Sequence, residues 1–272
     1  MPMPKVPSET SERSVQTFVR IRKKAIVILT AILLTVALLG GAFAIYVGNY
    51  YRADAQAIEA FSPAGEIEES SLDDGTLVFR PPYVSSALVF YPGGRVDYTA
   101  YIPLMRELAS RRMLCLLVKM PFNLAVFDIN AADGYREMFP EIERWFIGGH
   151  SLGGAMAASF IAGHTEKFSG LVLLGANSTA DLSTSGTAVL SVYGSLDGVM
   201  NRQKYEKYKK NLPKDAEEYI IEGGCLAGFG MYGVQKGDGT PTVSSQEQIR
   251  MTAEYIVSMI RSVEDFERNL MP

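Results

Sequence analysis

The feature that most constrains the fold is a glycine-rich turn at residues 147–154, which reads Ile-Gly-Gly-His-Ser-Leu-Gly-Gly. It places the pattern Gly-x-Ser-x-Gly around Ser151, directly after an apolar run at 145–147 and directly before an Ala-rich run at 153–166 with apolar residues at helical spacing. Strand, tight turn and helix in this order are typical of a nucleophile elbow. The two glycines of the pattern let the strand and the helix approach closely around a strained serine. The sequence therefore predicts that Ser151 lies at the amino end of a helix.

Apolar runs and amphipathic runs alternate from about residue 86 to the end of the chain, which predicts an α/β fold with a mostly parallel, doubly wound sheet covered by helices on both faces. A β-hairpin at 66–69 and 76–80 precedes them, around the turn Asp73-Asp74-Gly75. The expected strands are 86–91, 113–118, 145–147, 170–174, 189–193 and 218–222, and the expected helices are 98–112, 131–143, 153–166, 201–212 and 244–263. The functional loops of such a sheet lie at the carboxyl ends of its strands.

The N-terminal region predicts a membrane anchor. Residues 25–47 contain no charge and, as a helix, would be about 35 Å long, more than the hydrocarbon thickness of a bilayer. A basic cluster at 20–24 precedes this run and only Arg52 follows it closely, so we expect a cytoplasmic N-terminus and an extracytoplasmic remainder in the cell membrane. The alternative is a cleaved signal peptide, with small-x-small sites at 42–44 and 55–57. The expected organisation is a tail at 1–24, an anchor at 25–47, a stalk at 48–65 and one domain at 66–272.

Composition excludes several classes of function. The 272 residues carry a net charge of −4 and show no basic patch with interleaved aromatic residues after the anchor, so we expect no nucleic-acid partner. Two cysteines and two histidines, none at metal-ligand spacing, predict no metal site, and no cofactor is implied. Cys115 and Cys225 should lie near opposite edges of the sheet, which argues against a disulfide between them.

Several motifs in the right order resemble the α/β-hydrolase superfamily, and within it the compact bacterial group often labelled α/β-hydrolase family 5, which is commonly found behind an N-terminal anchor. The matching pieces cover most of residues 85–265. They are 90–94 (Phe-Tyr-Pro-Gly-Gly), 100–104, 118–125, the elbow, 193–198 (Tyr-Gly-Ser-Leu-Asp-Gly), 221–224 and 232–239.

This resemblance implies a serine hydrolase that acts on an ester or acyl bond of a small molecule. Ser151 would attack the carbonyl, and Asp197, which follows an apolar strand, would orient a histidine near the C-terminus. The backbone N–H of Leu152 and one from the loop at Gly93, Gly94 or Arg95 would form the oxyanion hole. For Asp197 the alternative is an ordinary turn residue, and for the two glycines it is relief of strain in a turn.

The chain departs from the family at the base. The family places its histidine shortly after a Gly-Gly pair, and here Leu226 occupies that position. An aliphatic side chain cannot accept the serine proton, so the triad is incomplete. His150 precedes Ser151 on the elbow strand and is interpreted as structural, whereas His164 ends the elbow helix, about 15 to 20 Å from the serine, and is too far away to serve as the base. Lys119 and Lys236 are alternative bases of the Ser-Lys kind, although solvated surface lysines are the commoner case.

Two functions follow from this pattern. The first is a membrane-anchored hydrolase with weak or lost activity, and the alternative is a non-catalytic protein that binds a ligand or a partner on the same fold.

Overall fold

Residues 9–61 and 65–270 are described by a computed structural model, and they divide into two units. The first unit, up to Asn49, contains the helix α1 (Glu9–Gly48). Its segment Arg22–Gly48 is 27 residues long and is apolar enough to cross a membrane. Residues 9–24 of the expected tail are therefore helical, and residues 1–8 of that tail lie outside the described residues.

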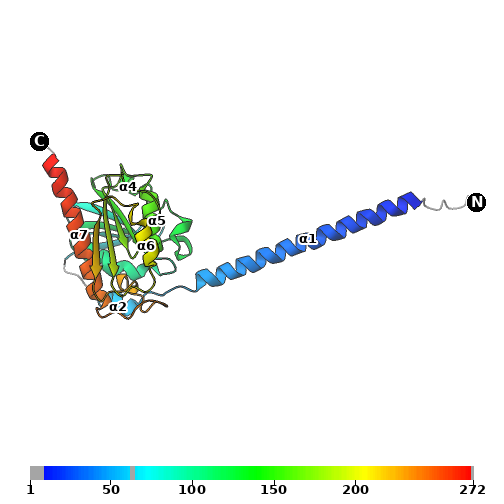
Figure 1. The fold of residues 1–272 in the computed structure, drawn as a ribbon, viewed down its shortest axis with the longest axis horizontal. Coiled ribbons are helices and arrows are strands. Elements are labelled where there is room, and N and C mark those ends of the chain that lie inside the picture. Colours follow the sequence, from blue (N-terminus) through cyan, green and yellow to red (C-terminus); the bar gives the residue numbers. More distant parts are fainter. Residues whose placement is uncertain (1–8, 62–64, 271–272) are drawn as a thin grey trace, which may run out of the picture. The chain divides into compact units, whose positions relative to one another are not determined.

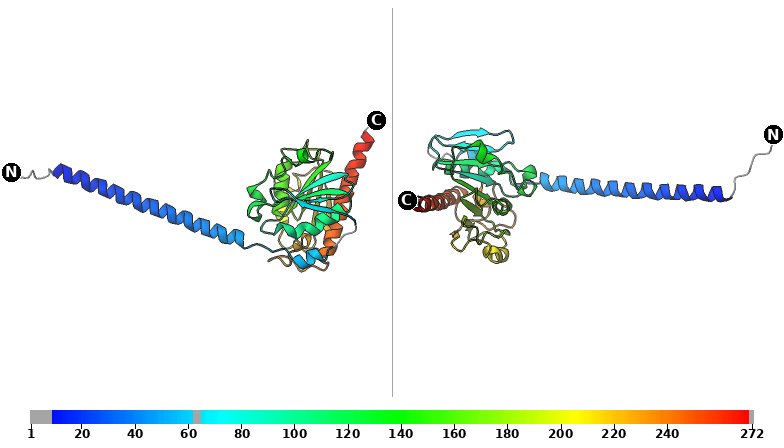
Figure 2. Two further views of the ribbon diagram at one scale, coloured as in Figure 1. Left: turned by 180° about the vertical axis from the view of Figure 1, so that it is seen from behind. Right: turned by 90° about the horizontal axis from the view of Figure 1, so that it is seen from above.

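The second unit, from Tyr50 onward, is built around an eight-stranded sheet with the order β1-β2-β4-β3-β5-β6-β7-β8. The strands are β1 (Glu68–Ser71), β2 (Leu77–Arg80), β3 (Ser86–Tyr91), β4 (Met113–Leu117), β5 (Trp145–His150), β6 (Gly170–Leu174), β7 (Ala188–Gly194) and β8 (Glu217–Ile221). All neighbouring pairs from β4 to β8 are parallel, whereas β1 and β2 form the expected antiparallel hairpin. Figure 2 shows this hairpin, in cyan, at one end of the sheet and α6, in yellow, at the other.

Helices cover both faces of the sheet, as the uninterrupted apolar strands predict (Figure 1). They are α2 (Ala55–Glu59), α3 (Ile102–Ala109), α4 (Tyr135–Met138), α5 (Leu152–Ile161), α6 (Arg202–Lys209) and α7 (Ser245–Leu270), with short 3₁₀ turns at Tyr98–Tyr101, Pro121–Asn123, Ala125–Phe127 and Ala227–Phe229. Successive residues of β3 alternate between two cores. Leu88 and Phe90 pack on the α3 and α7 side, and Ala87 and Val89 on the α5 side.

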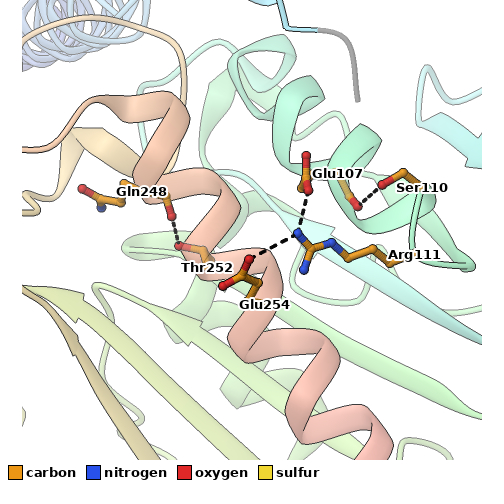
Figure 3. A network of polar contacts seen from close by, with 6 residues as sticks. All are labelled: Glu107, Ser110, Arg111, Gln248, Thr252 and Glu254. Carbon is orange, nitrogen blue, oxygen red and sulfur yellow. Dashed lines mark hydrogen bonds and ion pairs between the residues drawn. The ribbon is translucent and has the colours of Figure 1, made fainter. Parts of the chain in front are cut away.

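The two helices on one face, α3 and α7, are joined by a polar network at their surface (Figure 3). Arg111, which follows α3, forms ion pairs with Glu107 at 2.7 Å and with Glu254 of α7 at 3.8 Å. In the same region of α7, the hydroxyl of Thr252 donates to the carbonyl of Gln248 at 2.7 Å. The pair of Arg111 with Glu254 thus ties α7 to the end of α3.

Two parts of the chain differ from the sequence predictions. The expected helix at 131–143 is only α4, because Gly134 precedes it with a left-handed φ of 87° and Phe139 is followed by a proline, which disfavours helical backbone. The expected stalk at 48–65 is partly integrated into the second unit. Tyr51 forms a parallel bridge with Val96, and the side chain of Phe61 is buried.

Candidate active site around Ser151

Ser151 adopts a strained conformation at the turn between β5 and α5. Its φ of 51° and ψ of −117° lie outside the regions that residues with a side chain normally occupy. Its N–H donates to the carbonyl of Leu174 at 2.8 Å, which fixes the turn against β6. At Gly153 an added Cβ would lie 2.3 Å from the carbonyl oxygen of Tyr91, so this position requires glycine. The backbone thus has the strand, sharp turn and helix order that the sequence predicts.

Ser151 lines a small cavity of about 280 Å³ at the carboxyl ends of the strands. The other residues that line it are Leu152, Ala155, Gly175, Ala176, Asn177, Val199, Met200 and Asn201. None of these side chains is a base, and the only side-chain polar groups besides the serine hydroxyl are two amides. Lys119, Lys236 and His164 are not among the lining residues, and both lysines are exposed.

The N–H groups next to the elbow differ in their availability. The N–H of Gly93 donates to the hydroxyl of Tyr101 at 3.1 Å, and that of Arg95 donates to the carbonyl of Asn123 at 2.7 Å. Among the described residues, the N–H groups of Gly94 and Leu152 have no hydrogen-bond acceptor. Of the predicted oxyanion donors, the N–H groups of Gly93 and Arg95 are therefore engaged within the fold, and those of Gly94 and Leu152 are not.

His150 supports the site from beneath. Its Nδ1 lies 2.7 Å from the Tyr101 hydroxyl, and its ring is buried. Burial lowers the pKa of His150 to about 4, against the opposing effects of the Asp238 charge and the Leu226 carbonyl, so the imidazole is neutral. The Tyr101 hydroxyl thus accepts the Gly93 N–H and shares a second hydrogen bond with Nδ1 of His150. This network links the elbow to the Gly93 loop, in keeping with a structural role for His150.

Asp197 follows β7 and has one engaged and one unpaired carboxylate oxygen. Its Oδ1 accepts the N–H groups of Val199 at 2.9 Å and Met200 at 2.8 Å. Its Oδ2 is buried and has no hydrogen-bond partner among the described residues. Burial raises the pKa of Asp197, and the two N–H groups oppose this effect. An unpaired buried carboxylate oxygen is costly, so it marks a position where a donor is missing.

The side chain of Leu226 lies beside this carboxylate. An added Cβ at Gly175 would lie 2.4 Å from Cδ1 of Leu226 and 3.5 Å from Oδ2 of Asp197, so both side chains converge on the same point. Gly175 itself follows Leu174, whose carbonyl accepts the Ser151 N–H. The aliphatic side chain of Leu226, which is 1% exposed, is therefore buried next to Gly175 and near the Asp197 carboxylate.

Two residues that the sequence reasoning did not assign fix the loop that carries Leu226. Oδ1 of Asp238 accepts the Gly198 N–H at 3.1 Å, and its Oδ2 accepts the Ala227 N–H at 2.7 Å. The buried amide of Gln248 accepts the Cys225 N–H at 3.1 Å and donates to the Cys225 carbonyl at 2.8 Å. Figure 3 shows Gln248 near the start of α7. In the sequence, Asp238 was marked only by its place in the family-like motif at 232–239, and nothing marked Gln248.

The remaining sequence predictions concern metal ligands and cysteines. Within residues 9–61 and 65–270 there is no group of three or more His, Cys, Asp or Glu side chains that could hold a metal ion. Cys115 and Cys225 are both free and buried.

Comparisons with known proteins agree with this architecture. The family model Abhydrolase_5, described as an alpha/beta hydrolase family, matches residues 87–250, which is more than half of the chain. No curated protein matches the sequence.

Two solved structures are similar in fold. TT1662 of Thermus thermophilus is 13% identical, with a TM-score of 0.54 over 71% of this chain and 98% of that one. Est1E of Butyrivibrio proteoclasticus is 12% identical, with a TM-score of 0.51 over 73% of this chain and 100% of that one. At these identities the structures show the fold alone, and it is the family model, together with the sheet and the elbow, that identifies this chain as a member of the alpha/beta hydrolase family.

Proposed function

We propose that this protein is a membrane-anchored relative of serine ester and acyl hydrolases that retains the nucleophile Ser151 and the acid Asp197 without a base. In this proposal an ester or acyl ligand binds in the cavity at Ser151, and hydrolysis is slow or absent. The observation that carries it is the unpaired, buried Oδ2 of Asp197 beside Leu226. A triad histidine would donate to such an oxygen, and Leu226 cannot.

The retained parts can bind a carbonyl without driving its hydrolysis. The free N–H groups of Gly94 and Leu152 support binding of a carbonyl oxygen near the Ser151 hydroxyl. Without a base the serine proton has no acceptor, and oxyanion donors alone leave roughly 10³ to 10⁴ over the uncatalysed reaction. Turnover should therefore be far below that of an ordinary esterase.

The test measures hydrolysis of activated esters and labelling by a serine-directed phosphonate. Both are measured on the full chain in detergent, beside Ser151→Ala. We expect the unmodified protein to differ little from Ser151→Ala in esterase rate and to label slowly. A kcat/KM on the order of 10⁴ M⁻¹s⁻¹ or higher, abolished by Ser151→Ala, would show that another base exists and that the proposal is wrong.

The second candidate is a binding protein with no chemistry. It is favoured by the lining of the cavity, where the amides of Asn177 and Asn201 stand near Ser151 and no ionisable side chain is present. Thermal stabilisation by a non-hydrolysable ester analogue, without phosphonate labelling at Ser151, would select this function.

The proposed topology has residues 25–47 spanning the cell membrane, with the N-terminus in the cytoplasm and the hydrolase domain outside. It is supported by Arg20, Arg22, Lys23 and Lys24 before the span against Arg52 alone shortly after it. A reporter fused after Pro272 should then be extracytoplasmic, and the protein should resist extraction by high salt. A soluble fragment that begins near Ile45 or Ile58 would instead show a cleaved signal peptide.

A further inference from the structure

Exposed apolar side chains gather on the loops that flank the candidate site. These loops follow β4, β7 and β8, so they lie at the same edge of the sheet as Ser151. The apolar edge, as we name this set, consists of Phe122, Val126, Phe127, Leu196, Val199 and Val234. Because β5 lies between β4 and β7 in the sheet, the set borders the elbow on both sides.

One member of the apolar edge is held outward by an unfavourable backbone. Phe122 and Asn123 both have a φ of 55°, a left-handed conformation that is costly for residues with a Cβ. The Arg95 N–H donates to the Asn123 carbonyl at 2.7 Å, which ties this turn to the Gly93–Gly94 loop. The Phe122 ring is 55% exposed and meets the exposed ring of Phe127 edge-on at 5.5 Å. Because the Phe122 ring is exposed, burial in the core does not offset the cost of its left-handed backbone.

The polypeptide enters the second unit at this same edge. The Tyr51 N–H donates to the Arg95 carbonyl at 2.8 Å, and the Tyr51 carbonyl accepts the Asp97 N–H at 2.9 Å. The Tyr51 hydroxyl accepts the Lys236 N–H at 3.1 Å, within two residues of Val234. Tyr51 follows the last residue of α1, Gly48, by three positions, and three residues reach about 10 Å at most.

We propose that the apolar edge rests on the surface of the lipid bilayer that α1 crosses. The short linker holds this edge within reach of the membrane, and the aromatic and aliphatic side chains at 122, 126, 127 and 234 enter its interfacial layer. The mouth of the Ser151 cavity, which Val199 lines, then faces lipid. The inference rests on the proposed membrane span, and it does not depend on whether Ser151 catalyses any reaction.

The test places a fluorophore on single introduced cysteines in the full chain, reconstituted in phosphatidylcholine nanodiscs. Phe122→Cys and Val234→Cys probe the apolar edge, and the native cysteines, which are buried, are left in place. The matched control is Tyr83→Cys, which is 75% exposed and precedes β3, so it lies at the opposite edge of the sheet. Val234 is 87% exposed, so its replacement leaves the packing intact.

We expect bromination of the upper acyl chain to quench the label at 122 and 234 by at least about twofold, and to leave the label at 83 unchanged. Equal quenching at all three positions, or none, in a protein that remains bound to the nanodiscs would overturn the docking and leave the span intact. A chain that does not remain with the nanodiscs would overturn the span and the docking together. Neither result bears on the esterase and labelling measurements that test the Ser151 site.

Discussion

Replacement of Leu226 by histidine is the most informative perturbation of the proposed function, because it places a possible base beside the carboxylate of Asp197. Leu226 is buried, and its side chain lies beside the unpaired Oδ2 of Asp197. An imidazole there would gain a charged acceptor on one ring nitrogen and leave the other free towards Ser151. The substitution therefore tests both the register of the loop and the role of the carboxylate.

The stability change can be worked from these contacts. Loss of the buried Leu226 side chain costs about 1.5 to 3 kcal/mol of apolar burial. A hydrogen bond from the imidazole to the Asp197 carboxylate returns about 1.5 to 3 kcal/mol. We therefore expect the free energy of unfolding of Leu226→His to lie within about 1 to 2 kcal/mol of that of the unmodified protein. If the imidazole found no hydrogen-bond partner in the core, the loss would be larger by about 1 to 3 kcal/mol.

The catalytic change should be larger. A positioned general base contributes roughly 10² to 10⁴ in rate, which is about 3 to 5 kcal/mol of transition-state stabilisation. Leu226→His should raise kcat/KM for an activated ester, and the rate of phosphonate labelling, by a factor in that range. The rate should increase with pH through the pKa of the new imidazole, because only the neutral form accepts the serine proton.

The assay compares Leu226→His with three further variants. Leu226→Gln is the matched control, since its amide hydrogen-bonds but does not accept a proton. Adding Ser151→Ala or Asp197→Asn to Leu226→His should remove most of the gain. A Leu226→Gln protein as active as Leu226→His would refute the reasoning, as would a gain that survives Ser151→Ala. If the unmodified protein is already fast, Lys119→Ala and Lys236→Ala are the first variants to measure.

Three further predictions concern stability, each measured by denaturant unfolding. Burial raises the folded pKa of Asp197 above its usual value, so ionisation of this carboxyl opposes folding. Asp197→Asn should therefore raise the free energy of unfolding at neutral pH, and the gain should shrink as the pH falls and the carboxyl of the unmodified protein becomes protonated. Buried His150 has a pKa of about 4, so between about pH 6.5 and pH 4 its imidazole is protonated in the unfolded chain and neutral in the folded protein. As the pH falls through this range, the free energy of unfolding should therefore decrease by about 1.4 kcal/mol per pH unit. His150→Asn should remove that slope while His164→Asn retains it, and a slope unchanged in His150→Asn contradicts the assignment. Gly153→Ala should lower the free energy of unfolding by about 3 kcal/mol, because its Cβ would lie 2.3 Å from backbone carbonyl oxygens. The control Gly163→Ala, whose Cβ would have its nearest atom at 3.8 Å, should change it by less than about 1 kcal/mol. Equal effects of the two substitutions would show that the turn tolerates a side chain.

The parts of the fold that the sequence predicts well are those governed by local backbone chemistry. The strands and the elbow were recognisable because burial on both faces demands uninterrupted apolar runs, and because the sharp turn at Ser151 requires glycine beside it. The hairpin of β1 and β2 was recognisable for a similar reason, from its turn residues. The helix at 131–143 was overpredicted, because a left-handed Gly134 and a proline after Phe139 leave room for about one turn.

The parts that the sequence did not predict depend on contacts between distant segments. Tyr51 was expected in a stalk, since nothing in its neighbours indicates the pairing with Val96 across 45 positions. The Gly93 N–H is engaged because it donates to the hydroxyl of Tyr101, and the spacing of residues in the sequence does not indicate this side-chain contact. Asp238 and Gln248 were missed as supports of the Leu226 loop for the same reason.

On the proposed function, these supports explain how the loop at 225–227 keeps its position without a histidine at 226. Asp238 and Gln248 bind backbone groups of Cys225 and Ala227, and these bonds do not involve the side chain at 226. The carboxylate of Asp238 also accepts the Gly198 N–H, which fixes the loop that carries Asp197 to the loop that carries Leu226. A leucine at 226 then packs against Gly175 without disturbing either loop. If the proposed function is right, Leu226 removes proton transfer while the elbow and the N–H groups of Gly94 and Leu152 persist, and we then expect ligand binding at Ser151 to be separable from catalysis.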